Sequence, residues 1–238
     1  MKAVILAAGE GVRMQPLTLA TPKPMLKVSG KPILEHIIND LPDIVDEVII
    51  VVGYLGDKII NYFGSRFGRI KINYVVQREK LGTYHALSLC REYLSDGEKF
   101  LMLYADDLHG KSNLEKCISS EFCSLLVYPS DNPKKFGVVE SDQNGLIKGI
   151  EEKPENPKTN LVSTGVLMLD KKIFDYPARQ HKNGEYYLTD SIDQMIKAGH
   201  IFLAAKSDFW LPIGYPEDLV TAEETLKHKV ARLLELHQ

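Results

Sequence analysis

The 238-residue sequence has few cysteines and no long apolar run. Its three cysteines, Cys90, Cys117 and Cys123, fit no spacing typical of a zinc site or a disulfide framework, so we expect small buried thiols in a reducing compartment. No segment approaches the roughly 20 apolar residues that cross a bilayer. The N-terminal apolar run is shorter than the roughly 7 to 15 residues of an export signal. We therefore expect a cytoplasmic protein with no membrane partner.

The sequence also lacks an excess of positive charge. Its 29 Lys and Arg against 32 Asp and Glu give a net charge of −3. A chain of this sign has no overall field that attracts the phosphates of a nucleic acid. We therefore expect no nucleic-acid partner, and any phosphate binding must come from a local group of cations. The composition, with 44% hydrophobic residues, is that of an ordinary globular protein.

Short apolar runs alternate with helical patterns through the first half of the chain. The run at 47–53, EVIIVVG, is rich in the β-branched residues that favour strands. Crossover connections between such strands produce a parallel sheet with helices on both faces. The predicted strands lie at 3–7, 47–53, 70–75 and 99–105, and the predicted helices between them lie at 31–41, 55–63 and 82–94.

The pattern changes after Asp107. Short strands are interrupted there by Pro, Gly and Asn, and Gln143-Asn144-Gly145 is typical of a hairpin turn. Two helices are predicted at 188–198 and 216–236. We predict one α/β domain over 1–238, Rossmann-like, with three α/β/α layers, a mostly parallel central sheet and a small antiparallel insertion that binds substrate.

The last predicted helix has an apolar face. This face either packs against its own domain or forms an interface with a second copy of the chain, so a homo-oligomer stays open. The residues near this face are Leu219, Ala222, Leu226, Val230, Leu233 and Leu234.

A glycine-rich loop follows the first predicted strand. Gly9 and Gly11 would let backbone N–H groups approach a phosphate, because glycine has no Cβ to hold the anion away. Arg13, Lys23 and Lys27 add cations at the sheet edge where ligands bind. The spacing GxGxR matches neither the dinucleotide fingerprint nor the P-loop. A solvated surface loop therefore remains the alternative.

Two groups of charged residues end later strands. Asp106 and Asp107, in YADD, follow the predicted strand 99–105 and would repel each other unless a cation such as Mg²⁺ lay between them. The alternative is an acidic turn. Glu152 and Lys153 end a short strand before a proline, where a solvated turn would be the simpler interpretation.

These stretches carry a family resemblance. LAAGEGVRMQPLTLATPKPMLKVSGKPIL (6–34) resembles the signature of the sugar-1-phosphate nucleotidyltransferases, which include the glucose-1-phosphate thymidylyl- and uridylyltransferases. The resemblance covers nearly the whole chain. It continues through QREKLGT (77–83), YADD (104–107), FGVVE (136–140), EEKP (151–154), NLVSTG (160–165), GEYYLTD (184–190) and FWLPIGYPEDL (209–219).

The resemblance implies an enzyme that joins a nucleoside triphosphate to a sugar 1-phosphate, releasing pyrophosphate. The reaction would be an in-line attack on the α-phosphate with Mg²⁺ as cofactor. Residues 1–107 would form mainly the nucleotide-binding half, and 108–238 the sugar-phosphate half. The family includes fusions to an acetyltransferase domain, which is not expected within these 238 residues because they contain no hexapeptide repeats.

The resemblance also implies a role for each matching residue. Arg13 would grip the β- and γ-phosphates, Lys23 would stabilise the attacked α-phosphate, and Asp106 would hold Mg²⁺. The implied nucleotide-binding residues are Leu6, Ala7, Ala8, Gly9, Glu10, Gly11, Gln77, Leu81, Gly82 and Thr83. The implied sugar-phosphate residues are Asp107, Gly137, Glu152, Lys153, Asn160 and Thr164.

The sequence departs from the family pattern in three places. The family commonly has a metal-binding aspartate two residues after the tryptophan of the late motif, where this chain has Pro212; Asp208 or a substrate phosphate could replace it. Tyr84 and His85 stand where small residues are usual, and ADD replaces GDN or GDV. Two alternatives therefore stay open: a cytidylyltransferase for a non-sugar phosphate or phosphonate such as phosphocholine, and a nucleotide-sugar-binding regulator without turnover.

Overall fold

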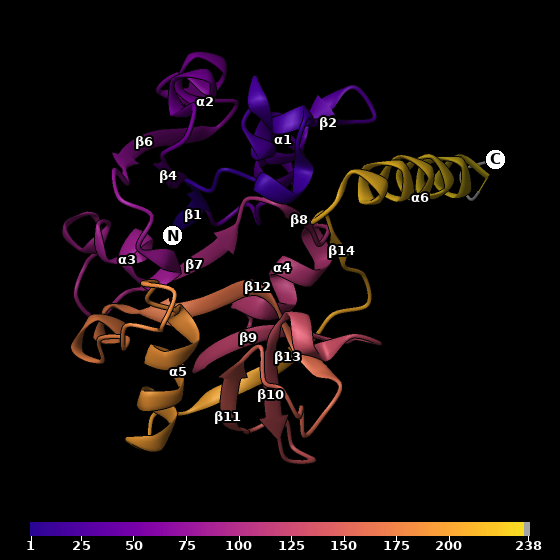
Figure 1. The fold of residues 1–238 in the computed structure, drawn as a ribbon. Helices are drawn as coiled ribbons and strands as arrows, with labels where there is room; N and C mark the ends of the chain where they lie inside the picture. The colour runs from indigo at the N-terminus through magenta and orange to yellow at the C-terminus, as the bar shows by residue number, and fades with distance from the viewer. Residues whose placement is uncertain (236–238) are drawn as a thin grey trace.

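The computed structural model describes the backbone of residues 1–235 and the side chains of residues 1–228. Its centre is a ten-stranded sheet (Figure 1). The first half of the chain contributes a parallel core: β1 (Lys2–Ala7) lies between β4 (Glu47–Val52) and β7 (Lys99–Tyr104), and β6 (Ile70–Val76) follows β4. The antiparallel β5 (Arg66–Phe67) ends this side of the sheet.

The second half extends the same sheet with antiparallel strands. The long strand β12 (Leu161–Asp170) pairs with β7 and carries β9 (Cys123–Pro129) and the hairpin of β10 (Gly137–Ser141) and β11 (Ile147–Glu152). The strand β13 (Phe202–Lys206) pairs with β9. Two small sheets complete the structure, β2 (Lys27–Val28) with β3 (Lys31–Pro32) and β8 (Asp107–Leu108) with β14 (Leu211–Pro212).

Helices cover both faces of the central sheet. One hydrophobic cluster joins one face to α1 (Ile33–Asn39), α2 (Gly56–Phe63), α4 (Lys111–Ile118) and α6 (Pro216–Glu235). A second cluster joins the other face to α3 (Gly82–Ser88) and α5 (Leu188–Lys197). Alternate residues of β1 belong to different clusters, Ile5 to the first and Val4 to the second. This explains why the strand reads as a continuous apolar run.

The predicted α/β class and three-layer arrangement with a mostly parallel sheet are confirmed, and so is the hairpin turn, in which Gly145 N–H donates to Asp142 O at 3.0 Å. Two predicted helices are shorter than expected. The helix at 31–41 begins at Ile33 because Lys31 and Pro32 pair with β2. The helix at 82–94 ends at Ser88, and a separate 3₁₀ turn follows at Arg91–Tyr93.

The helix α6 packs on the domain at its start and extends away from it (Figure 1). Ala222 is buried, and Leu219 and Leu226 pack against the first cluster. This supports packing against the chain's own domain for the first half of the predicted apolar face. The predicted face residues Val230, Leu233 and Leu234 lie outside the described side chains. All three cysteines are buried and unpaired thiols, as predicted.

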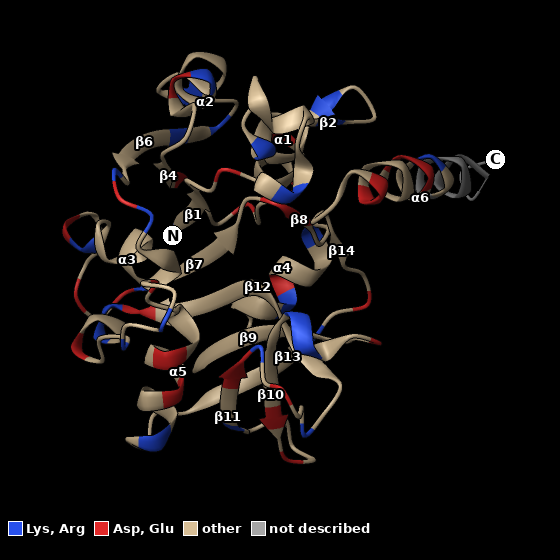
Figure 2. Cartoon of the chain, in the orientation of Figure 1, with Lys and Arg blue, Asp and Glu red and all other residues tan. Residues whose placement is uncertain are grey.

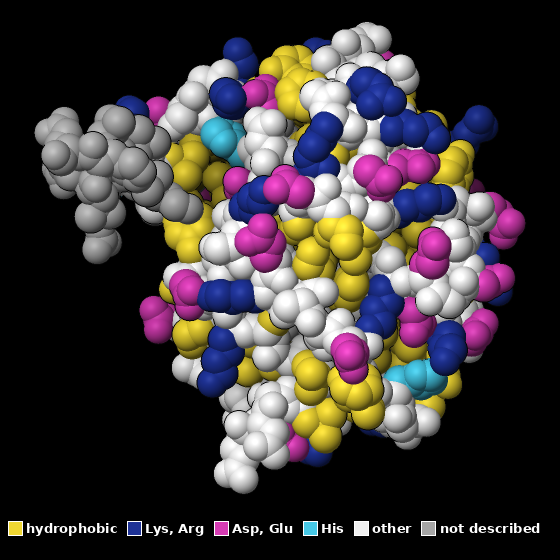
Figure 3. All heavy atoms as spheres, turned by 180° about the vertical axis from the view of Figure 1, so that it is seen from behind, with side chains coloured by type: hydrophobic (Ala, Val, Ile, Leu, Met, Phe, Trp, Pro, Cys, Tyr) yellow, Lys and Arg dark blue, Asp and Glu magenta, His cyan; other side chains and the backbone are white. Residues whose placement is uncertain are grey.

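Charges of both signs are spread over the molecule. Segments of both signs are scattered over the ribbon in Figure 2, and side chains of both signs are interspersed on the face seen in Figure 3. Within the described residues, no helix is both long enough and apolar enough to cross a membrane.

Candidate active site

The glycine loop leaves β1 and turns back sharply over Lys23. Gly11 adopts a φ of +62°, which glycine tolerates without strain, and its carbonyl accepts hydrogen bonds from Met14 N–H at 2.8 Å and the Thr18 hydroxyl at 2.9 Å. A Cβ on Gly11 would lie 2.9 Å from Cβ of Lys23. Only glycine therefore allows the loop to approach the lysine this closely. Leu6 and Ala7 end β1, and Ala8 to Glu10 form the start of the loop.

Lys23 lies on a short 3₁₀ turn, Lys23–Met25, between two prolines. Its side chain is 9% exposed, and its ammonium lies 2.6 Å from Oδ2 of Asp106. Asp106 follows the carboxyl end of β7, and its carbonyl accepts a hydrogen bond from Ile213 N–H at 3.1 Å. The lysine predicted to bind phosphate and the aspartate predicted to bind the metal therefore meet at the edge of the sheet. Lys23 is buried while the Asp106 side chain is 36% exposed, so the carboxylate stays open to solvent on one side.

Asp107 begins β8 and lies beside the late motif. Its Oδ2 accepts a hydrogen bond from Nε1 of Trp210 at 3.1 Å. Burial raises the pKa of Asp107 well above its usual value, and the Asp106 charge raises it further, against the opposing effects of Lys23 and Trp210. Pro212 is the direct partner of Asp107 in the β8–β14 pair. Pro212 therefore faces a carboxyl group across the strand pair. Asp208, the residue suggested to replace the missing metal-binding aspartate, is instead ion-paired with Lys116 and largely exposed.

Arg13 lies on the 3₁₀ turn Val12–Met14 of the glycine loop, and its side chain reaches Tyr215, the residue before α6. Its guanidinium carbon is 5.1 Å from the centroid of the Tyr215 ring, and it donates a hydrogen bond to the Tyr215 hydroxyl. The ammonium of Lys135 lies 5.1 Å from the same centroid. The sequence motifs predicted no role for Tyr215 or Lys135, although Tyr215 lies within the late motif and Lys135 directly precedes FGVVE.

The loop predicted to meet the base is fixed by the segment 184–190. Gly82, with a φ of +89°, packs so closely on Tyr186 that a Cβ would lie 2.6 Å from the Tyr186 carbonyl oxygen. Tyr186 N–H donates to Leu81 O at 2.8 Å, and Leu188 N–H donates to Thr83 Oγ1 at 3.0 Å. These contacts join the two halves of the chain.

Two polar contacts hold the remaining nucleotide-side residues. The Gln77 side-chain amide donates to Gly82 O at 3.1 Å and contacts Nδ1 of His85 at 3.0 Å. Glu10 forms an ion pair with Lys80, which links the glycine loop to the loop at 77–82. His85 is therefore held by its contact with the Gln77 side chain.

The predicted sugar-side residues gather around Glu152. Gly137 is its cross-strand partner, and a Cβ there would lie 3.6 Å from Glu152 Oε2 and 3.0 Å from the Thr189 methyl group. The Thr189 hydroxyl donates to Glu152 at 3.1 Å. Lys153 adopts a φ of +44°, pairs with Glu152 at 3.2 Å, and places its ammonium 5.2 Å from the Tyr187 ring. Thr189 was not predicted, although its motif was.

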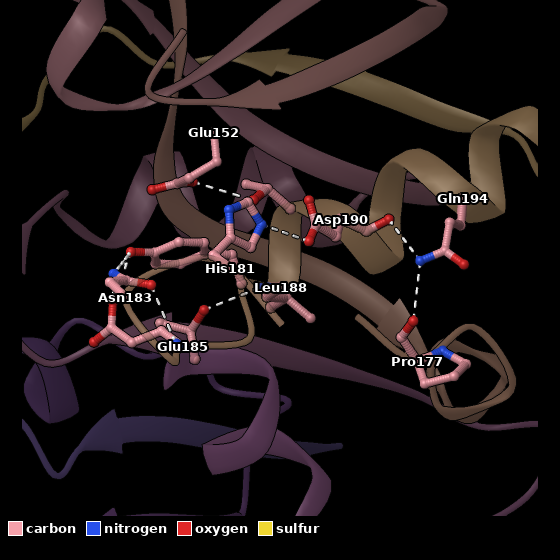
Figure 4. A network of polar contacts seen from close by, with 11 residues as sticks. Glu152, Pro177, His181, Asn183, Glu185, Leu188, Asp190 and Gln194 are labelled. Atoms are coloured by element: carbon pink, nitrogen blue, oxygen red, sulfur yellow. Dashed lines mark hydrogen bonds and ion pairs between the residues drawn. The ribbon is translucent and has the colours of Figure 1, made fainter. Parts of the chain in front are cut away.

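A polar network joins this group to the segment 177–194 (Figure 4). His181 contacts Asp190 at 2.7 Å, and Asn183 donates to Glu185 at 2.9 Å. The Tyr187 hydroxyl donates to Glu185 at 2.6 Å. Tyr187 contacts Lys153, and Thr189 contacts Glu152. The network therefore positions the partner of each of these two residues.

Two predicted sugar-side residues lie apart from Glu152 in their contacts. Thr164 is 1% exposed, and its hydroxyl donates to Leu126 O inside the sheet at 3.1 Å. Asn160 is exposed just before β12, and its carbonyl accepts from Ser130 N–H at 2.8 Å. The sequence motifs did not indicate His109, whose Nε2 donates to Thr164 O at 3.0 Å.

Tyr104 is a further residue that the sequence motifs did not single out. It ends β7 and hydrogen-bonds Thr83. A Cβ on Gly165 would lie 2.5 Å from the Tyr104 ring, so the glycine of NLVSTG makes room for the tyrosine. Burial raises the pKa of Tyr104. Tyr104 is therefore a neutral phenol that contacts Thr83 in the loop predicted to meet the base.

The donor set suits a magnesium ion shared with substrate. No cluster of three or more His, Cys, Asp or Glu that could hold a metal occurs within the described part of the chain. Mg²⁺ is typically bound by one or two carboxylates, and substrate phosphates and water complete its coordination. Asp106, whose side chain is partly exposed and contacts the ammonium of Lys23, fits that arrangement.

The chain is similar to proteins of one family along nearly its full length. The model of the family described as nucleotidyl transferase matches residues 2–229. The bifunctional protein GlmU of Methanocaldococcus jannaschii is 37% identical over 232 residues, which are 97% of this chain and 55% of that protein. The UTP–glucose-1-phosphate uridylyltransferase AglF of Haloferax volcanii is 34% identical over 246 residues, covering 99% of this chain and 100% of that protein.

The fold has a solved counterpart. A crystal structure of a candidate glucose-1-phosphate thymidylyltransferase from Bacillus anthracis, in complex with sucrose, matches with a TM-score of 0.82 and 27% identity over 94% of both chains. The present chain spans about half the length of the GlmU relatives. On these matches, the chain belongs to the nucleotidyl transferase family, among the sugar-1-phosphate nucleotidyltransferases.

Proposed function

We propose that this chain joins a nucleoside triphosphate to a sugar 1-phosphate, giving a nucleoside diphosphate sugar and pyrophosphate in a Mg²⁺-dependent reaction. The observation that carries the proposal is the contact between Lys23 and Asp106 beneath the glycine loop. It brings a buried cation and a carboxylate to the edge of the sheet where ligands bind in parallel α/β folds. A cytoplasmic location is part of the same proposal.

The phosphate oxygen of a sugar 1-phosphate is already a nucleophile at neutral pH, so the chain need not supply a general base. The barrier comes from bringing two polyanions together and from the charge at the attacked phosphorus. Lys23 would stabilise that charge, and Arg13 would hold the β- and γ-phosphates. Asp106 would hold Mg²⁺, which when bound neutralises phosphate charge and orients the leaving group.

The remaining predicted residues would bind the two substrates. The backbone of 6–11 would surround the triphosphate, and the loop held by Tyr186 would meet the base through Gln77, Leu81, Gly82 and Thr83. Gly137, Glu152 and Lys153 would hold the sugar phosphate, with Asp107 and Asn160 completing that side. Thr164 would support that side from within the sheet, because its hydroxyl is bonded to Leu126 O. The group around Glu152 supports this assignment, because it combines hydrogen-bond acceptors for hydroxyls with a cation for the phosphate.

Pyrophosphate release tests the proposal directly. The purified chain is assayed with each of ATP, CTP, GTP, UTP and dTTP against several sugar 1-phosphates and phosphocholine, with Mg²⁺ and with EDTA. UTP with glucose 1-phosphate is the first pair, since AglF carries that name and matches this chain end to end. Release only with phosphocholine would favour the non-sugar alternative. Binding without release on any pair would favour the regulator and contradict the proposed enzyme.

A further inference from the structure

The aromatic ring of Tyr215 contacts two cations that come from distant parts of the chain. Arg13 belongs to the glycine loop in the first half of the chain. Lys135 belongs to the 3₁₀ turn Pro133–Lys135, which precedes strand β10. The guanidinium carbon of Arg13 and the ammonium of Lys135 each lie 5.1 Å from the ring centroid. The two cations therefore lie at most twice that distance apart.

The backbone that carries the ring is fixed by hydrogen bonds of Tyr215 and of the two residues before it. One carboxylate oxygen of Asp218 accepts from Gly214 N–H at 2.7 Å and from Tyr215 N–H at 2.8 Å, which caps the start of α6. The neighbouring Ile213 N–H donates to Asp106 O at 3.1 Å. Tyr215 is thus tied both to a helix and to the backbone of the proposed metal ligand.

A carboxylate near the pair is that of Asp218: a Cβ on Gly214 would lie 3.7 Å from its Oδ2 and 3.9 Å from Nη1 of Arg13. Among the described residues, neither Arg13 nor Lys135 takes part in an ion pair, and their contacts are with the Tyr215 ring and hydroxyl. Both side chains are exposed. Two cations that lie near each other and form no direct ion pair attract a ligand that carries several negative charges, because one carboxylate does not balance two cations. Because the ring already restricts both side chains, they lose less conformational entropy when such a ligand binds than two free side chains would.

We propose that Lys135 is a further polyphosphate-binding residue and that Tyr215 is the positioning residue that holds Arg13 and Lys135 together. This inference rests on the proposed function. The Tyr215 cation pair, Arg13 and Lys135, contacts the terminal phosphates of the nucleoside triphosphate and the pyrophosphate product. As the bond from the α-phosphorus to the bridging oxygen breaks, its electron pair stays on pyrophosphate, and the pair stabilises that added charge.

The test is direct binding of pyrophosphate to the full chain by titration calorimetry in the presence of MgCl₂. Lys135→Ala is compared with Lys134→Ala, which removes the neighbouring exposed lysine of the same turn. We expect Lys135→Ala to weaken binding about tenfold, equivalent to about 1.4 kcal/mol. Lys134→Ala is expected to bind like the unaltered chain. Equal affinity in the two variants would overturn the inference.

Two variants of Tyr215 separate positioning from folding. Tyr215→Phe keeps the ring and is expected to retain most of the affinity, whereas Tyr215→Ala is expected to lose about as much as Lys135→Ala. The double variant Lys135→Ala/Tyr215→Ala should then lose little more than either single variant, because both changes remove one interaction. Full additivity, or unchanged affinity in Tyr215→Ala, would contradict the positioning role.

The KM values distinguish this role from a general structural defect. The KM for the triphosphate is expected to rise in Lys135→Ala while the KM for the sugar 1-phosphate stays unchanged, and the melting temperature should not move. An unaltered chain that bound neither pyrophosphate nor any triphosphate would overturn the proposed function together with this inference. Normal binding by the unaltered chain and by Lys135→Ala would overturn the inference alone.

Discussion

The ammonium of Lys23 lies 2.6 Å from the carboxylate of Asp106, with both side chains at the carboxyl edge of the central sheet. The two residues are 83 positions apart in the chain. They meet because β7 pairs directly with β1, whose following loop carries Lys23. Lys23 places a positive charge beside Asp106, and in the proposed reaction the same lysine would stabilise the attacked α-phosphate.

Replacing Lys23 with alanine should abolish most turnover. By analogy with lost oxyanion donors, a cation that acts chiefly in the transition state contributes on the order of 10² to 10³ in rate. The measurement is kcat for pyrophosphate release, with circular dichroism to confirm folding. Lys27→Ala is the matched control, since that lysine is exposed on β2 of the same segment. Near-normal turnover in the Lys23 variant would contradict its proposed role.

Replacing Asp106 with asparagine should change the metal dependence. The amide keeps the shape of the side chain but removes the charge that attracts Mg²⁺. We expect the Mg²⁺ concentration for half-maximal turnover to rise on the order of tenfold or more. Asp208→Asn serves as the control, because that carboxylate is exposed and paired with Lys116. Identical Mg²⁺ curves for the two variants would argue against Asp106 as the ligand.

The parallel half of the fold could be predicted from the sequence because its signals are local. Each buried strand is a short run of β-branched and apolar residues, as in EVIIVVG, and each helix shows its own periodicity. The order of the second half could not be predicted. The strand β12 pairs with β7, β9 and β10, and nothing within Leu161–Asp170 specifies those three partners.

The site shows the same division between local and distant signals. The sequence motifs singled out Lys23, Asp106 and Glu152 as candidates, because the chemistry of a phosphate site restricts the residue type. They did not identify Tyr215 or Lys135, whose relation to Arg13 depends on how the start of α6 lies over the glycine loop. Contacts of this kind join segments far apart in sequence and leave no periodic pattern.

Replacing Gly82 with alanine should destabilise the nucleotide-side loop. The new Cβ would meet the Tyr186 carbonyl oxygen at 2.6 Å, with a φ of +89°. Gly97→Ala is the matched control, because its φ is +76° but nothing lies within 4 Å. We expect Gly97→Ala to lower the free energy of unfolding by about 1 kcal/mol through backbone strain. Gly82→Ala should lower it by a further 1–3 kcal/mol, roughly, through overpacking.

The same pair of variants tests the link to substrate binding. The KM for the triphosphate should rise in Gly82→Ala and stay unchanged in Gly97→Ala, since Gly97 lies in an open turn away from this loop. Equal losses of stability in the two variants would show that the contact with Tyr186 contributes nothing beyond the backbone conformation.

Acid should destabilise the fold through His109. Burial lowers the pKa of His109 from 6.5 to about 4, while its Nε2 donates to Thr164 O at 3.0 Å. Between these two values the unfolded chain binds a proton that the folded chain does not, so stability falls as the pH decreases. The shift corresponds to about 3 kcal/mol, lost progressively from pH 6.5 down to about 4.

The prediction is tested by urea unfolding at a series of pH values. Glutamine at position 109 can still donate to the Thr164 carbonyl but does not titrate, so His109→Gln should lose less stability than the unaltered chain over this pH range. His181→Gln is the control, because that histidine is exposed and paired with Asp190. If unaltered chain and His109→Gln lost stability in parallel as the pH fell, the buried imidazole would not be the source of the acid sensitivity.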